Sequence, residues 1–211
     1  MTSRNKLIPL TAALWVAVYF VTLIWSGIHP KDTLTWLLEV LPAMIAFVLL
    51  AVTRRRFPFT SLAYFLILIH CLILMVGGHY TYAEVPLFDS LGNYFGWQRN
   101  NYDKLGHLAQ GFVPAIVARE ILIRNAVVAP GKWLSFIVVC ICLAISALYE
   151  LIEWWVALAS GQAAEAFLGT QGYIWDTQSD MAYALMGAIA ALVLLGRMHD
   201  RQIRRLSENG D

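Results

Sequence analysis

The sequence predicts an all-α membrane protein that crosses a lipid bilayer with about six helices. Of its 211 residues, 59% are hydrophobic and only 14% are charged, whereas roughly 25% of the residues in an ordinary soluble domain are charged. Several apolar runs are long enough to cross a bilayer, which takes about 20 helical residues. The basic residues are distributed unevenly among the segments between these runs. Together these observations indicate a single polytopic membrane domain over residues 1–211.

The apolar runs give the expected helix boundaries. They lie at about 7–27, 34–52, 59–77, 105–123, 133–159 and 177–196. Pro42 and Pro114 fall inside the second and fourth runs, where neighbouring helices can satisfy the carbonyl groups that a proline leaves free. Two outer loops are expected at about 78–103 and 160–176. Both loops are rich in aromatic residues of the kind that anchor proteins at a membrane interface: Tyr80, Tyr82, Tyr94, Trp97, Tyr102, Tyr173 and Trp175.

The basic residues predict the orientation. Of the 15 lysines and arginines, all but Lys31, Arg99 and Lys104 lie on one side of the expected helices. Because basic loops stay on the cytoplasmic side, both termini are expected in the cytoplasm. The total of 15 basic against 14 acidic residues gives no field suited to nucleic acid. Membrane lipid is therefore the expected partner, and nucleic acid is not.

Polar side chains recur at helical spacing near the outer ends of the last three expected helices. Asp103, His107 and Gln110 follow one face of the fourth, because residues three and four positions apart share a helix face. Asp176 and Asp180 are four apart at the start of the sixth. Side chains on one face of each helix can meet inside a bundle, so these rows predict a shared polar site.

Two glutamates on the fifth expected helix lie deeper in the membrane. Glu153 is expected on the order of 10 Å below the outer helix end, and Glu150 lies one turn further in. A carboxylate at the bilayer centre costs roughly 2.5–3.5 kcal/mol on insertion scales, so these groups should be protonated, paired or metal-bound in the bundle interior. Glu39 on the second helix, with His79 and Glu84 after the third, are further candidates for the same site.

Ordinary structural roles are the alternative for each of these residues. Asp103 and Asp176 lie where a helix N-cap is expected, and aspartate is a preferred cap. His107 can serve as a hydrogen-bonded packing residue. Arg119 and Glu120 close the fourth helix at its cytoplasmic end and are expected at the interface.

Three stretches of the sequence resemble a known family. NYDKLGHLAQGF, SALYELIEWW and YIWDTQSDMAYALMGA are similar to segments of the bacterial inner-membrane proteins of the YjdF type, and the resemblance extends over nearly the whole chain. It implies a location in the bacterial cytoplasmic membrane, with the polar loops facing the periplasm or cell exterior. It implies no particular reaction.

A shorter resemblance concerns the C-terminal half. The order D-K-x-x-H, then E, then D followed by small residues is similar to that of VanZ-like membrane proteins, some of which are linked to glycopeptide resistance. The matching positions are Asp103, Lys104, His107, Glu150 or Glu153, and Asp180. The additional N-terminal helices and the long aromatic loop depart from that pattern, so the resemblance does not transfer an activity.

The first functional hypothesis is a metal-assisted enzyme that acts on a lipid or lipid-linked envelope substrate. Asp103, His107, Glu153 and Asp180 offer the nitrogen and oxygen ligands that hold a divalent metal such as zinc, manganese or magnesium. Glu150 would serve as the general base for a metal-activated water. The sequence contains no H-E-x-x-H motif, so this hypothesis depends on residue types and helix faces rather than on a metal signature.

Two other classes of function compete with the enzyme. Intramembrane carboxylates and a histidine also suit the proton or cation path of a small transporter or lipid-translocating protein. A structural or accessory membrane protein would use the same groups only to hold its helices together. The three hypotheses differ in what a neutralising mutation removes: bound metal, transport or stability.

Overall fold

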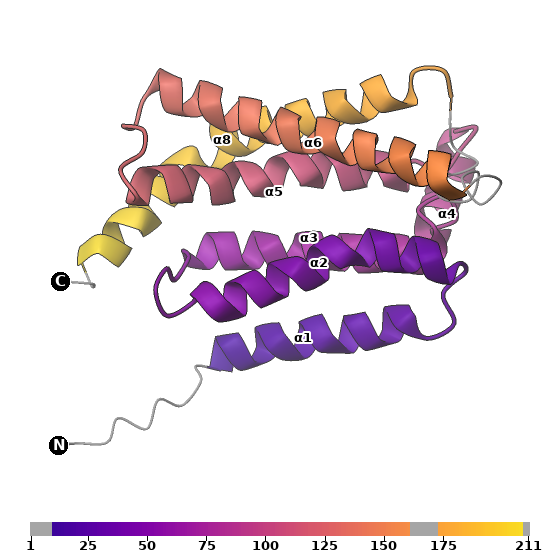
Figure 1. The fold of residues 1–211 in the computed structure, drawn as a ribbon, viewed down its shortest axis with the longest axis horizontal. Helices are drawn as coiled ribbons and strands as arrows, with labels where there is room; N and C mark the ends of the chain where they lie inside the picture. Colours follow the sequence, from indigo (N-terminus) through magenta and orange to yellow (C-terminus); the bar gives the residue numbers. More distant parts are fainter. Residues whose placement is uncertain (1–9, 161–172, 209–211) are drawn as a thin grey trace.

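In the described part of the chain, six long helices run along the longest dimension of the molecule, and one short helix lies across one end (Figure 1). The computed structural model describes residues 10–160 and 173–208, and within these ranges it contains no strand. The helices are α1 (Leu10–Gly27), α2 (Thr33–Thr53), α3 (Ser61–Tyr80), α4 (Pro86–Phe95), α5 (Tyr102–Arg124), α6 (Lys132–Ser160) and α8 (Asp176–Glu208). The expected all-α polytopic fold is confirmed.

Five of the described helices, α1, α2, α3, α6 and α8, are long and apolar enough to cross a membrane. The sixth expected span is α5, which carries charged residues at both ends and is too polar to meet that criterion. It nevertheless runs beside α3, α6 and α8, so protein covers much of its surface. The start of α1 and the end of α8 lie at the same end of the bundle (Figure 1). The cytoplasmic placement of that end stays a prediction.

The tightest packing in the bundle is between α5 and α8. A Cβ atom added to Gly111 of α5 would overlap the carbonyl oxygen of Ala184, and one added to Gly187 of α8 would overlap that of Leu108. The two backbones therefore touch without intervening side chains, as small residues at helix interfaces allow. Ala184, Ala188 and Gly187 are buried on the same face of α8.

The long helices form two groups. α1, α2 and α3 pack together in one, and α5, α6 and α8 pack together in the other (Figure 1). The two groups meet mainly where α3 lies against α5. Met75 of α3 and Ile116 of α5 are fully buried in the apolar core that contains this contact. The long helices of the described residues thus form two three-helix halves that are joined mainly through α3 and α5.

Two expected boundaries differ from the structure. The outer segment 78–103 is not a continuous loop, because α3 continues to Tyr80 and α4 fills its middle. Pro86 begins α4, consistent with the preference of proline for the first helical turn. The last helix continues twelve residues past the expected end at 196, because His199 and Ile203 are buried against the bundle and keep one face of the extension packed. Most of the second outer loop, 160–176, lies outside the described residues.

Two aromatic residues of the first outer segment do not belong to an interfacial belt. Tyr82 and Tyr102 are buried, and their rings meet edge to face with centroids 5.5 Å apart. The hydroxyl of Tyr102 donates to the carbonyl oxygen of Ile73 at 2.9 Å. Gly77 and Gly106 leave room for the Tyr82 ring, since a Cβ atom at either position would overlap it. These tyrosines fix the turn after α3 against the start of α5.

A glycine substitution can test the α5–α8 contact. We expect Gly187→Ala to lower stability by about 1–3 kcal/mol, the usual cost of overpacking, because the new methyl group would overlap the Leu108 carbonyl oxygen. Gly196→Ala is the matched control on the same helix, since no atom lies within 4 Å of the position of its Cβ. That control should be neutral or slightly stabilising. Thermal unfolding in detergent measures both, and equal melting temperatures for the two variants would contradict the close contact.

Candidate functional site

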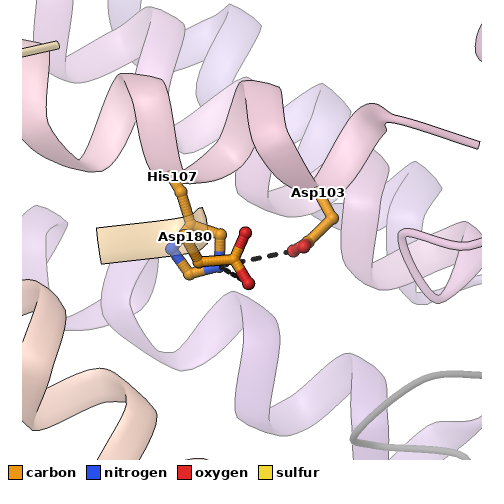
Figure 2. Close-up of side chains that lie close together, drawn as sticks. All are labelled: Asp103, His107 and Asp180. Atoms are coloured by element: carbon orange, nitrogen blue, oxygen red, sulfur yellow. Dashed lines mark ion pairs between the residues drawn. The ribbon is translucent and has the colours of Figure 1, made fainter. Parts of the chain in front are cut away.

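His107 lies close to two aspartates in the polar site, and Figure 2 shows the three side chains. Its Nε2 atom is 3.4 Å from Oδ1 of Asp103, one turn earlier on α5. The same nitrogen is 4.0 Å from Oδ2 of Asp180, which α8 contributes. One ligand atom from each of the three residues lies within 4.8 Å of the other two. The close α5–α8 packing therefore brings Asp180 to the pair that α5 already carries at i, i+4 spacing.

The second ring nitrogen of His107, Nδ1, contacts a different set of polar groups. Nδ1 of His107 is 3.2 Å from Oε1 of Gln110 and 3.9 Å from Oε1 of Glu150 on α6. When Nδ1 carries the proton, it donates to the Gln110 oxygen and leaves the Nε2 lone pair directed toward the two aspartates. This division is typical of metal-binding histidines, whose second nitrogen donates to a carboxylate or carbonyl oxygen.

The site is buried and rich in oxygen acceptors. His107, Glu150 and Asp180 are buried, and Asp103 is partly exposed. Among the described residues, Oδ1 of Asp180 and Oε1 of Glu150 have no hydrogen-bond partner. No lysine or arginine of residues 10–160 and 173–208 forms an ion pair with Asp103, Asp180 or Glu150. A buried carboxylate without a cationic partner is costly, so these groups must be protonated, paired with a protonated His107 or bound to a cation.

A cavity of about 640 Å³ adjoins the site. Glu39, Glu153 and Tyr149 line it together with Asp103 and His107. The Tyr149 hydroxyl donates to Oε2 of Glu39 at 2.7 Å and so connects α6 to α2. The Tyr149 ring also meets the His107 ring nearly edge-on, with centroids 6.1 Å apart. Glu39 and Glu153 are therefore neighbours of the site, but neither belongs to the three-residue cluster.

The remaining candidates lie elsewhere. Asp176 does not reach His107 but receives a hydrogen bond from Arg99 at 3.1 Å. His79 stacks against Trp25, and its Nδ1 lies 3.0 Å from the Ser26 carbonyl oxygen. Glu84 pairs with Lys31. The sequence correctly predicted that these three residues lie at the same end of the bundle as the cluster. Helix rotation and loop contacts, however, direct their side chains away from it.

The capping alternative does not apply to Asp103. Asn101 occupies the N-cap position of α5, and its side chain makes no capping hydrogen bond. Asp103 instead lies inside the first turn, which directs its carboxylate toward His107 one turn later. The position of this aspartate is therefore consistent with a role in the cluster.

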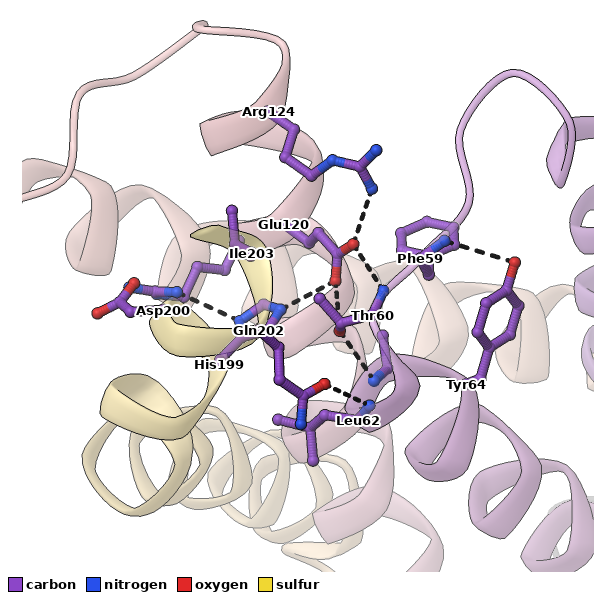
Figure 3. Close-up of polar contacts among 12 residues, drawn as sticks. Phe59, Thr60, Leu62, Tyr64, Glu120, Arg124, His199, Asp200, Gln202 and Ile203 are labelled. Carbon is purple, nitrogen blue, oxygen red and sulfur yellow. Dashed lines mark hydrogen bonds and ion pairs between the residues drawn. The ribbon is translucent and has the colours of Figure 1, made fainter. Parts of the chain in front are cut away.

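A second buried polar cluster lies at the opposite end of the bundle, around Glu120 (Figure 3). Glu120 is fully buried and accepts from the Thr60 backbone N–H at 2.9 Å and from the Thr60 hydroxyl at 2.7 Å. His199 of α8 is also fully buried, with Nε2 2.9 Å from Oε2 of Glu120. Arg124 donates to the other carboxylate oxygen at 2.9 Å. The expectation that Glu120 is interfacial was wrong, because three segments converge on it.

This second cluster differs from the first because its polar groups have hydrogen-bond or ion-pair partners within the cluster. Arg119 donates to Asp200 at 2.6 Å, and the Gln202 side chain accepts from the Leu62 backbone N–H at 3.0 Å. The contacts join the extension of α8 to α5 and to the turn before α3. The sequence offered one signal for them: His199 and Ile203 are four apart within an otherwise polar segment. The cluster is therefore a structural network that holds three segments together, rather than a reactive site.

Removal of one side chain from this hydrogen-bond network tests its contribution to stability. We expect Glu120→Ala to cost about 3–5 kcal/mol of stability, because it leaves buried polar partners without their acceptor. His199→Ala should cost a similar amount, and the double variant should lose less than the sum because the two groups share one interaction. Thermal unfolding in detergent measures the stability of the wild type, the two single variants and the double variant. Glu208→Ala, which removes an exposed carboxylate from the same helix, is the control, and additive losses would disprove the coupling.

Comparisons with known proteins agree with the fold. A family model described as "Predicted membrane protein (DUF2238)" matches residues 11–201. The inner membrane protein YjdF of Escherichia coli (strain K12) is 57% identical over 183 residues, which cover 87% of this chain and 88% of that relative. No solved structure matches the chain. These matches support the YjdF-type resemblance and add nothing to the VanZ-like one. The chain therefore belongs to the DUF2238 family of membrane proteins, and it is a multi-pass protein of the bacterial inner membrane.

Proposed function

We propose that this protein is a metal-assisted enzyme that acts on a lipid or lipid-linked substrate within the membrane. The observation that carries the proposal is the convergence of Asp103, His107 and Asp180, whose ligand atoms lie within 4.8 Å of one another. The cluster adjoins a large cavity with a mainly apolar lining. A reactive centre beside an apolar cavity suits a substrate that carries a hydrocarbon chain.

The donor set is suited to a divalent cation. One imidazole nitrogen and two carboxylate oxygens match the ligands of zinc or manganese, and three protein ligands leave a position open for water or substrate. The two aspartates would balance the charge of a divalent ion, which removes the cost of burying them unpaired. A bound metal would supply Lewis acidity and an acidified water.

The surrounding residues have separate roles in this proposal. Gln110 holds the His107 ring through Nδ1, at 3.2 Å. Glu150 is the proposed general base, because its Oε1 is buried beside His107 without a hydrogen-bond partner. In a hydrolysis, the water oxygen would bond to the reacting centre while one water proton passes to Glu150. The leaving oxygen would then take up that proton as its bond to the reacting centre breaks.

Metal content is the measurement that tests the proposal. We expect about one divalent ion per chain in detergent-purified wild-type protein, and less than a tenth of that in Asp103→Asn and Asp180→Asn, because each variant loses one ligand. Asp176→Asn is the matched control, one turn from Asp180 on α8 but paired with Arg99, and it should keep its metal. Elemental mass spectrometry gives the ratio, and metal-free wild-type protein that is folded would refute the metal centre.

Turnover is tested separately from metal binding. Glu150→Gln should retain the metal but lose at least a hundredfold in rate, the usual scale of a general base. Wild-type and variant protein would be incubated with a bacterial lipid extract, and mass spectrometry would follow the loss of a lipid and the appearance of its product. Equal conversion by both proteins would remove Glu150 from the mechanism, and conversion by neither would contradict the enzyme.

A lipid-translocating role is the second candidate, and the length of the cavity favours it. The cavity continues from the polar site to Thr53 and Phe59 near the other end of the bundle. Translocation would appear as exchange of a labelled lipid between the leaflets of vesicles that contain the protein. Exchange without chemical conversion would favour this candidate over the enzyme.

A further inference from the structure

The cavity opens along the seam between α2 and α6. These two helices line opposite sides of it but make no extended contact with each other. Leu49 of α2 and Ile145 of α6 both line the cavity and are also exposed on the molecular surface. Both helices are among the five that are apolar and long enough to span a membrane. The opening therefore faces the hydrocarbon region of the bilayer, so a lipid could enter sideways.

The dimensions of the cavity match one long hydrocarbon chain. Glu39 and Thr53 of α2 line its two ends, a separation of about 21 Å along the helix at 1.5 Å per residue. This exceeds the roughly 15 Å depth of one leaflet of hydrocarbon, half of the usual bilayer core. At roughly 30 Å³ for each water-sized group, the volume of about 640 Å³ has room for one long hydrocarbon chain.

Asp103 and His107 line the polar end of the cavity, where a headgroup would lie. The cluster of Asp103, His107 and Asp180 supplies the proposed cation. Lys104 follows Asp103 on α5, and its Nζ lies 5.7 Å from the ring centroid of Tyr183 on α8. Unlike Lys31 and Arg99, Lys104 forms no ion pair within residues 10–160 and 173–208. A divalent cation at this end of the cavity favours an anionic headgroup.

We propose that the α2–α6 cavity holds the single long chain of a lipid phosphate monoester, which enters from the bilayer with its phosphate at the Asp103–His107–Asp180 cluster. The phosphate part of this assignment rests on the proposed metal centre. The chain part rests on the size, lining and lateral opening of the cavity. The Tyr149–Glu39 hydrogen bond joins α6 to α2 beside the site. The seam between these helices is therefore open toward the opposite end of the cavity, where the hydrocarbon chain would lie.

Photo-crosslinking tests this assignment in the full-length protein. The probe is hexadecyl phosphate with a diazirine near the end of its chain, presented in phospholipid nanodiscs that contain the protein. We expect the label on peptides of α2, α5 and α6 that line the inner half of the cavity. Ala118→Trp, which fills the cavity from α5, should reduce that labelling at least tenfold. Ala13→Trp places the same side chain on the exposed surface of α1 and should leave labelling unchanged.

Competition in the wild-type protein keeps the test independent of how the tryptophan variant folds. Unlabelled hexadecyl phosphate should displace the probe, whereas octyl phosphate and dipalmitoyl phosphatidate should require at least tenfold higher concentrations. Equal competition by the two-chain lipid, or labelling spread evenly over the lipid-facing helices, would overturn the single-chain assignment.

Metal analysis of the same samples separates the two proposals. Labelled cavity peptides in a metal-free wild-type protein would refute the metal centre and the phosphate part, and would support the chain site. A full complement of metal with no labelled cavity peptides would refute the chain site and would support the metal centre.

Discussion

The backbone contact between α5 and α8 determines where the functional groups of this protein lie. Gly111 and Gly187 let the two helices approach until each backbone touches the other. At this separation the short side chain of Asp180 comes within 4.0 Å of His107. A larger residue at either glycine would overlap the facing backbone and push the two helices apart. The close packing of small residues and the polar cluster are therefore two consequences of the same interface.

The two ends of the bundle deal differently with buried charge. At the end that contains the start of α3, Glu120 is surrounded by donors from Thr60, Arg124 and His199. Such a network stabilises the junction of its segments without any external ligand. At the other end, the carboxylates outnumber the donors, and two buried oxygens have no partner among the described residues. This imbalance, rather than the mere presence of acidic residues in a membrane, distinguishes the two clusters and supports the proposed ligand at the first.

The sequence predicted the elements of the fold better than their mutual contacts. Apolar run length located the six long helices, and i, i+4 spacing correctly paired Asp103 with His107. It could not show which residues of different helices meet, because helix rotation depends on packing that a single sequence does not display. Glu153 illustrates this limit, since it shares a helix face with Glu150 but lines the cavity without joining the three-residue cluster.

Long-range contacts account for the features that the sequence did not reveal. The hydrogen bonds of Glu120 to Thr60 and His199 join residues 60 and 79 positions apart. Tyr82 was expected at the membrane interface, but Gly77 and Gly106 make space for its ring inside the protein. In both cases the local sequence is ambiguous. A polar or aromatic residue near a helix end suits an interface as well as an interior, and only the neighbouring segments decide between them.

The two halves of the bundle contribute different parts of the site: one half holds the polar cluster, and the other forms the opposite wall of the cavity. Asp103, His107, Asp180 and Glu150 all belong to α5, α6 and α8, which pack directly on one another. The opposite wall of the cavity comes from α2 and α3, and among the described residues the Tyr149–Glu39 hydrogen bond connects α6 to α2 near the site. A displacement of α2 that broke this bond would widen the seam between α2 and α6 but leave the three ligand atoms in place. Access to the cavity through this seam would then leave the geometry of the cluster unchanged, as the proposed metal centre requires.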